Sequence, residues 1–147
     1  MISWGFLGAG WIAKTAMAPA VHAAHNATLQ AVASRDHDRA KALGPHTVYE
    51  SYEDLLADPT IDAVYINLAN DQHCHWSIAA LAAGKHVLCE KPIALDYAQA
   101  QLMADAAKKY DRVLVEAVWS QWHPRFIRAV ELIQAGEIGK LTSIDSS

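Results

Sequence analysis

An apolar run at the start of the chain leads directly into a glycine-rich turn, and this junction restricts the possible folds more than any other feature. Residues 2–7 predict a buried strand, and residues 10–25 predict an alanine-rich helix. The turn between them, Gly8-Ala9-Gly10, begins a G-x-G-x-x-A pattern that ends at Ala13. A strand, a tight glycine turn and a helix in this order are typical of the first unit of a parallel α/β sheet.

Short β-rich runs and longer helical patterns alternate along the rest of the chain. The predicted strands cover residues 28–33, 47–49, 63–68, 86–89, 113–118 and 141–144, and the predicted helices cover residues 36–43, 51–58, 71–83, 95–110 and 124–135. Connections of this length allow right-handed crossovers between parallel strands. We therefore predict an α/β fold with a doubly wound parallel sheet, in which ligands bind at the carboxyl ends of the strands.

Composition excludes several classes of protein. The 147 residues are 52% hydrophobic and 19% charged, which indicates one folded domain and not a disordered chain. With 12 Lys and Arg against 16 Asp and Glu, a nucleic-acid partner is disfavoured. The longest uncharged stretch, residues 15–34, contains Pro19 and Gln30, and it predicts no membrane span. No basic residue precedes the first apolar run, so no signal peptide is expected, and two cysteines favour a reducing, cytoplasmic setting.

A metal site is not predicted. His73, Cys74 and His75 are adjacent, but residues one or two apart on a helix do not share a face. These side chains therefore could not converge on one ion.

The glycine turn predicts dinucleotide binding. Gly8 allows a tight turn, Gly10 lets the backbone approach a diphosphate, and Ala13 allows close packing of helix and strand. The N–H groups at the start of the helix then face the phosphates. The alternative is that these small residues only pack.

The end of the second strand bears on the type of dinucleotide. The position where NAD-binding folds place an acid holds Ser34, followed by Arg35, and Arg39 lies one helical turn further. A hydroxyl and guanidinium groups suit a 2′-phosphate, which favours NADP, with NAD as the alternative. Asp36 could hold a ribose, although its expected role is to cap the following helix.

Glu90-Lys91-Pro92 follows the fifth strand. The residue before a proline is held in an extended or turn geometry, so Lys91 is expected to stand over the cleft at the end of that strand. An ammonium group in this position could exchange a proton with a substrate hydroxyl while a hydride leaves the adjacent carbon. The alternative is an ordinary surface lysine in a turn.

Together, residues 8–13 and the segment from Ala82 to Pro92 resemble the glucose–fructose oxidoreductase/inositol dehydrogenase family (Gfo/Idh/MocA). Residues 51–56 and 116–120 are most similar to its dihydrodiol dehydrogenase-like branch. The resemblance implies a Rossmann fold, a catalytic role for Lys91, and a cis peptide before Pro92. It also implies a set of cofactor-binding residues: Gly8, Gly10, Trp11, Ile12, Ser34, Arg35, Arg39, Leu68, Asn70, His73, Glu90, Lys91, Trp119 and Gln121.

Within that set, Asn70 and His73 match an Asn-x-x-His motif that lines the nicotinamide ribose in the family. Leu68 and Ala69 stand where the family usually has Thr-Pro, and Gln121 stands where it often has Arg. The chain therefore departs from the family at Leu68 and Gln121, and the cofactor contacts implied for these two residues differ from the usual ones.

Members of this family are about twice as long as this chain. The resemblance therefore implies a dinucleotide-binding domain over residues 1–120, and a linking helix and strand over residues 121–147 that lead into a missing C-terminal substrate domain. The implied activity is hydride transfer between NADP(H) and a secondary alcohol or ketone of a sugar, polyol or cyclic diol. The chain alone is expected to be inactive.

Two other functions remain open at this point: a non-catalytic dinucleotide-binding or sensing module, and a protein that binds another adenine nucleotide. The expected partner is a small-molecule substrate. A homo-oligomer is a further alternative, because Trp119, Trp122 and Phe126 form an apolar cluster that could associate if exposed.

Overall fold

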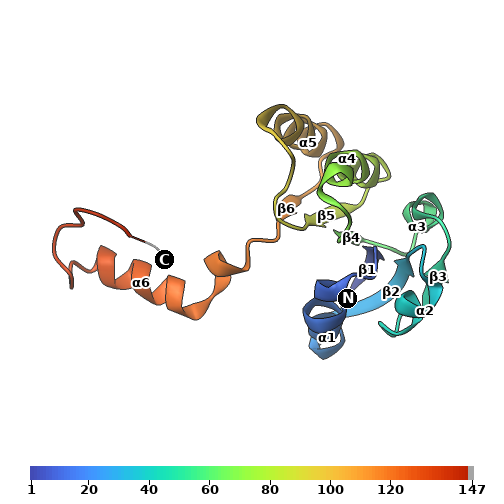
Figure 1. Ribbon diagram of the computed structural model, residues 1–147, viewed down its shortest axis with the longest axis horizontal. Coiled ribbons are helices and arrows are strands. Elements are labelled where there is room, and N and C mark those ends of the chain that lie inside the picture. Colours follow the sequence, from blue (N-terminus) through green and yellow to red (C-terminus); the bar gives the residue numbers. More distant parts are fainter. Residues whose placement is uncertain (146–147) are drawn as a thin grey trace. The chain divides into compact units, whose positions relative to one another are not determined.

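The computed structural model describes residues 1–145, and its centre is a six-stranded parallel sheet (Figure 1). The strands are β1 (Ile2–Leu7), β2 (Ala27–Ala33), β3 (Thr47–Tyr49), β4 (Ala63–Ile66), β5 (His86–Cys89) and β6 (Leu114–Glu116). Their order is β3-β2-β1-β4-β5-β6, and every neighbouring pair is parallel. The predicted doubly wound α/β fold is confirmed. The strand order reverses between β1 and β4, which is where such sheets bind ligands.

Helices connect the strands. They are α1 (Ala18–Ala23), α2 (His37–Lys41), α3 (Tyr52–Ala57), α4 (His73–Ala82), α5 (Tyr97–Tyr110) and α6 (Pro124–Gln134). A π-helical segment, Ala13–Met17, precedes α1. Side-chain oxygens of Asp36, Ser51 and Asp96 accept hydrogen bonds from the backbone N–H three residues further on, which starts α2, α3 and α5.

Apolar side chains cover both faces of the sheet. Adjacent residues of one strand belong to different hydrophobic clusters: Phe6 and Tyr65 lie in one cluster, and Leu7 and Ile66 in the other. All four side chains are fully buried. A sheet that is covered on both faces needs continuous apolar strands, which explains why residues 63–66 show no polar alternation.

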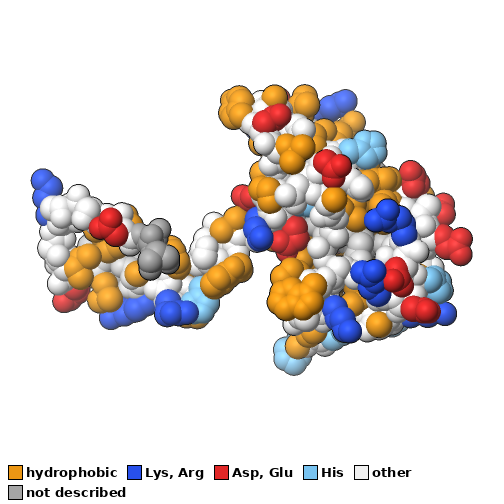
Figure 2. Space-filling model, viewed as in Figure 1, with side chains coloured by type: hydrophobic (Ala, Val, Ile, Leu, Met, Phe, Trp, Pro, Cys, Tyr) orange, Lys and Arg blue, Asp and Glu red, His pale blue; other side chains and the backbone are white. Residues whose placement is uncertain are grey.

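The chain divides into two compact units, Met1–Ala117 and Val118–Ser147. The described part of the second unit, residues 118–145, contains a 3₁₀ turn (Trp119–Trp122) and α6, and none of its residues is buried. Figure 2 shows hydrophobic side chains on its surface, and Trp119, Trp122 and Phe126 are among the exposed ones. The first unit therefore holds both hydrophobic clusters.

The strand predicted over residues 141–144 is absent: residues 141–145 have no regular secondary structure. A strand needs a neighbouring backbone to satisfy its N–H and C=O groups, and the second unit contains no strand in its described part. Two other strands are shorter than predicted: β4 ends at Ile66, and β6 covers only Leu114–Glu116, which pair with Val87–Cys89. Within residues 1–145, no helix is both long and apolar enough to cross a bilayer.

Candidate functional site

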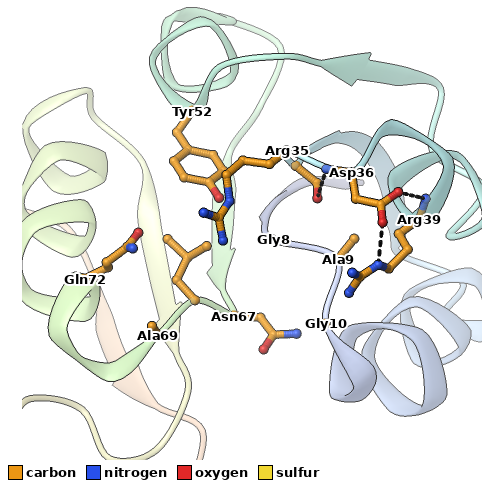
Figure 3. A pocket seen from close by; sticks show the side chains of 12 residues that line it. Gly8, Ala9, Gly10, Arg35, Asp36, Arg39, Tyr52, Asn67, Ala69 and Gln72 are labelled. Carbon is orange, nitrogen blue, oxygen red and sulfur yellow. Dashed lines mark hydrogen bonds and ion pairs between the residues drawn. The ribbon is translucent and has the colours of Figure 1, made fainter.

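A pocket of about 480 Å³ lies at the carboxyl ends of β1, β2 and β4 (Figure 3), which is in the usual range for small-molecule sites. Twelve residues line it: Gly8, Ala9, Gly10, Ser34, Arg35, Asp36, Arg39, Tyr52, Asn67, Leu68, Ala69 and Gln72. They come from the glycine turn, the segment after β2 together with α2, the start of α3 and the segment after β4. These segments meet because parallel strands bring their carboxyl ends to one edge of the sheet.

The glycine turn packs directly against the segment after β4. Gly8 has a φ of +94°, and a Cβ built on it would lie 2.3 Å from the backbone oxygen of Asn67. A Cβ on Gly10 would lie 2.9 Å from Nδ2 of Asn67. Gly8 is therefore required by its backbone conformation and by the close packing of two loops, whereas a side chain at Gly10 would have to displace the side chain of Asn67. The approach of a diphosphate, which was the reason predicted for Gly10, would be a second requirement.

The end of β2 places one carboxylate and two guanidinium groups at the pocket. Oδ1 of Asp36 accepts a hydrogen bond from the backbone N–H of Arg39 at 3.0 Å, and Oδ2 accepts one from Nε of Arg39 at 2.7 Å. These contacts, the backbone hydrogen bond first, hold the pKa of Asp36 below its usual value. The predicted capping role of Asp36 is confirmed.

Arg35 differs from Arg39 in having no such partner. Within residues 1–145 its guanidinium forms no ion pair or hydrogen bond, and its side chain is exposed and lines the pocket. Figure 3 shows the Asp36 carboxylate turned toward Arg39, whereas the Arg35 side chain points away from Arg39. Ser34 accepts a hydrogen bond from the backbone N–H of Asp36 at 3.1 Å, which leaves its own hydroxyl hydrogen free for another acceptor.

Sequence reasoning missed Asn67, which lies between Gly10 and Leu68 in the pocket wall. Its Nδ2 atom is buried and has no hydrogen-bond partner in the described part of the chain. A signal was available, since Asn67 is the first polar residue after the fully buried strand β4. Tyr52 and Gln72 were also missed, and no local pattern marks them, because only the packing of α3 and of the segment before α4 brings them to the pocket.

The turn after β5 carries Lys91, which is exposed and not among the pocket-lining residues. The peptide between Lys91 and Pro92 is cis, as the resemblance implies. Glu90 accepts a hydrogen bond from the hydroxyl of the buried Tyr65 at 2.6 Å, and its second oxygen lies 3.3 Å from the backbone N–H of Lys91. Burial and the adjacent Glu90 carboxylate raise the pKa of Tyr65. The phenol therefore stays protonated as a hydrogen-bond donor.

The other predicted cofactor residues lie outside the pocket lining. The side chain of Trp11 is 74% exposed, Ile12 packs against a hydrophobic cluster, and Asn70 is exposed in a 3₁₀ turn. His73 is fully buried, so its ring has no surface for direct contact with a ligand. Trp119 and Gln121 belong to the second unit.

No metal centre is visible: residues 1–145 contain no group of three His, Cys, Asp or Glu side chains that could hold an ion. This finding concerns the described residues alone. Cys74 and Cys89 are both free thiols.

Comparison with known proteins agrees with the observed parallel α/β fold. A family model described as an oxidoreductase family with an NAD-binding Rossmann fold matches residues 2–118. The chain is 41% identical to D-xylose 1-dehydrogenase (NADP(+)) 2 of Haloferax volcanii over 98% of its own length, and 35% identical to trans-1,2-dihydrobenzene-1,2-diol dehydrogenase of Mus musculus over 95%.

Among solved structures, a 3-ketoreductase from Actinomadura kijaniata in complex with NADP matches with a TM-score of 0.87 and 35% identity over 95% of this chain. The chain spans 45% of the Haloferax protein, 44% of the mouse protein and 45% of the ketoreductase. It therefore corresponds to less than half the length of each relative.

Proposed function

The chain belongs to the oxidoreductase family with an NAD-binding Rossmann fold, and from this premise we propose that residues 1–117 bind NADP(H). One observation carries the proposal. The pocket at the switch point of the sheet combines the glycine turn with Arg35, whose guanidinium has no partner in residues 1–145. A glycine turn can receive a diphosphate, and a free guanidinium can pair with a phosphate through two parallel hydrogen bonds.

The state of Asp36 supports NADP over NAD. An acid that holds a ribose 2′-hydroxyl would repel a 2′-phosphate in the same place. Here the carboxylate of Asp36 already accepts two hydrogen bonds from Arg39, one from its backbone N–H and one from Nε, and it is therefore engaged in capping α2. The proposed 2′-phosphate site therefore consists of Arg35, Arg39 and the hydroxyl of Ser34. The NADP named for two of the matched proteins agrees with this assignment.

Titration of the chain with NADPH and NADH, followed by nicotinamide fluorescence, tests the assignment. Arg35→Ala should weaken NADPH binding by about 10- to 100-fold, because a hydrogen-bonded charged pair contributes about 1.5–3 kcal/mol, and should leave NADH binding unchanged. Lys41→Ala, which removes an exposed charge from α2 outside the pocket, is the control. Equal affinities for NADPH and NADH that do not change in Arg35→Ala would contradict the proposal.

For the chemistry, we assign the proton transfer to Lys91. When bound, the nicotinamide supplies or accepts a hydride at its C4 carbon. Oxidation of a secondary alcohol also releases the hydroxyl proton, which the Lys91 amine would accept, and in reduction the ammonium would return it to the carbonyl oxygen. The named substrates of the matched dehydrogenases, a sugar and a cyclic diol, support a secondary alcohol or ketone of that class.

The relatives extend for more than half of their length beyond the matched part, and we propose that their substrate pocket lies there. The chain by itself, given NADP and D-xylose, should then form NADPH far more slowly than typical enzymes, whose turnover is about 1–1,000 per second. Absorbance of NADPH measures this directly. Turnover in the enzyme range would refute the placement of the substrate pocket.

The two free thiols fit a reducing compartment, and we propose a cytoplasmic protein on that basis. Self-association is proposed from the exposed Trp119, Trp122 and Phe126. Sedimentation at increasing concentration checks it, and a strict monomer at high concentration would argue against it.

A further inference from the structure

The peptide unit that joins Pro92 to Ile93 is held by a side chain at each end. Its carbonyl oxygen lies 2.8 Å from Nδ1 of His73, and its N–H donates to Oε1 of Glu116, also at 2.8 Å. His73 begins α4 and Glu116 ends β6, so two elements far apart in sequence contact one peptide plane. This plane is one residue beyond Lys91, and its rotation would move the backbone on which the Lys91 side chain is mounted.

His73 also contacts the pocket wall. Its other ring nitrogen, Nε2, lies 3.1 Å from the carbonyl oxygen of Leu68, which lines the pocket. A carbonyl oxygen can only accept a hydrogen bond, so the ring is the donor wherever a bond forms. The imidazole is fully buried. The ring therefore connects the segment after β4 with the turn after β5.

We propose that His73 and Glu116 are positioning residues that clamp the Pro92–Ile93 peptide and thereby orient Lys91 relative to the pocket. The inference rests on the proposed function, because the orientation of Lys91 matters only if a nicotinamide binds nearby. It replaces the direct contact with the nicotinamide ribose that the resemblance implies for His73. A ring with no exposed surface acts on a ligand through the backbone that it holds.

Two substitutions separate the two contacts of His73. The amide of Asn reaches about as far as Nδ1 of histidine, so His73→Asn keeps a donor for the carbonyl oxygen of Pro92. The amide of Gln reaches about as far as Nε2, so His73→Gln keeps a donor for the carbonyl oxygen of Leu68. Both variants retain a buried polar side chain of similar size. The clamp predicts that only His73→Asn preserves the orientation of the peptide.

Amide hydrogen exchange at Ile93 is the first measurement, since this N–H donates to Glu116. Loss of the Pro92 contact should accelerate its exchange by about fivefold in His73→Gln, because one net hydrogen bond contributes about 1 kcal/mol. His73→Asn should stay within about twofold of the wild type. Equal exchange of Ile93 in the two variants would overturn the clamp, and this readout does not depend on any cofactor.

Ligand affinity is the second measurement. NADPH contains the nicotinamide, whereas 2′,5′-ADP contains only adenosine with its 2′- and 5′-phosphates. His73→Gln should weaken NADPH binding by about fivefold or more and change 2′,5′-ADP binding by less than about twofold, whereas His73→Asn should change neither. His75→Asn, an exposed histidine on the same helix, is the matched control.

A general loss of structure would lower the affinity for both ligands together, and that result would also overturn the positioning role. Failure of the wild-type chain to bind either ligand would instead refute the proposed function. In that case the exchange of Ile93 still decides whether the clamp exists.

Discussion

The two ends of β5 carry one lysine each, and the environments of these lysines are opposite. Lys85 precedes the strand, is only 6% exposed, and its Nζ donates to the carbonyl oxygens of Asp58 at 2.6 Å and Ile61 at 2.8 Å. Lys91 follows the strand and is exposed, and within residues 1–145 its Nζ has no hydrogen-bond acceptor. Both belong to the same short motif. Residue type and sequence distance therefore do not separate a buried, hydrogen-bonded lysine from an exposed one, whereas the end of the sheet at which the lysine lies does.

The difference follows from the architecture. In a parallel sheet the carboxyl edge has loops that diverge at the switch point and leave a crevice, and the amino edge is closed by the returning connections. Lys85 satisfies two backbone carbonyls of the segment that leads into β4, and burial lowers its pKa. Among residues 1–145, no acceptor occupies the N–H donors of the Lys91 side chain.

The largest effect is expected from substitution of the two lysines. Lys85→Met preserves length but removes the donor of the Ile61 carbonyl oxygen and leaves the Asp58 carbonyl oxygen with only the 3.4 Å hydrogen bond from the backbone N–H of Ile61, so the free energy of unfolding should fall by about 2–4 kcal/mol. Lys91→Met, at an exposed position, should change it by less than about 0.5 kcal/mol. Urea unfolding of both variants measures the difference. Similar losses of stability would break the contrast.

A pair of glycines provides the second test. Gly8, at the carboxyl edge, has a φ of +94°, and a Cβ built on it would lie 2.3 Å from a backbone oxygen. Gly84, at the amino edge, has a φ of +79°, and the nearest atom to its Cβ position would be Nη2 of Arg112 at 3.8 Å. Gly84→Ala should cost about 1–2 kcal/mol for its left-handed backbone alone, and Gly8→Ala about 2 kcal/mol more. Chemical denaturation at one pH is sufficient. Equal costs would mean that the two loops at the pocket can separate freely.

A third, smaller effect concerns alkaline pH. Burial and Glu90 raise the pKa of Tyr65, whose ordinary value is 10.0. Above that pH the unfolded chain releases a proton that the folded chain retains, so stability should fall with pH by up to about 1.4 kcal/mol per unit. Tyr65→Phe should flatten this slope at a cost of about 1 kcal/mol near neutrality.

Unfolding measured between pH 9 and about pH 11 gives the slope. Tyr97→Phe, at a position that is 81% exposed, serves as the control and should follow the wild type. A wild-type slope that persists in Tyr65→Phe would show that the Tyr65–Glu90 contact is not what responds to pH.

The smallest effect is expected in the second unit. The side chain of Ile127, on α6, is 48% exposed, and Ile127→Ala should change the free energy of unfolding by less than about 0.5 kcal/mol. Thermal or urea unfolding followed by circular dichroism is adequate. A loss comparable to that of Lys85→Met would mean that α6 contributes to a buried core.

Much of the fold was predictable because its signals are local. The apolar strands, the caps at Asp36 and Ser51, and the glycine turn depend on neighbours within a few residues. The strand expected at 141–144 failed for the opposite reason, since pairing needs a partner strand that local sequence cannot provide. The motif around Lys91 was found by its pattern. Tyr52 and Gln72 had no pattern, because they reach the pocket only through helix packing.

The sequence by itself determined the α/β class, the strand-turn-helix site and the presence of a lysine after β5, because turn geometry and apolar periodicity are properties of short segments. Only the tertiary structure decided what individual polar side chains do. It pairs Asp36 with Arg39, buries His73 between two carbonyl oxygens and gives Arg35 no polar partner among residues 1–145. The physical reason is that the partners of a polar group lie on other strands and helices, which the chain brings together only when it folds.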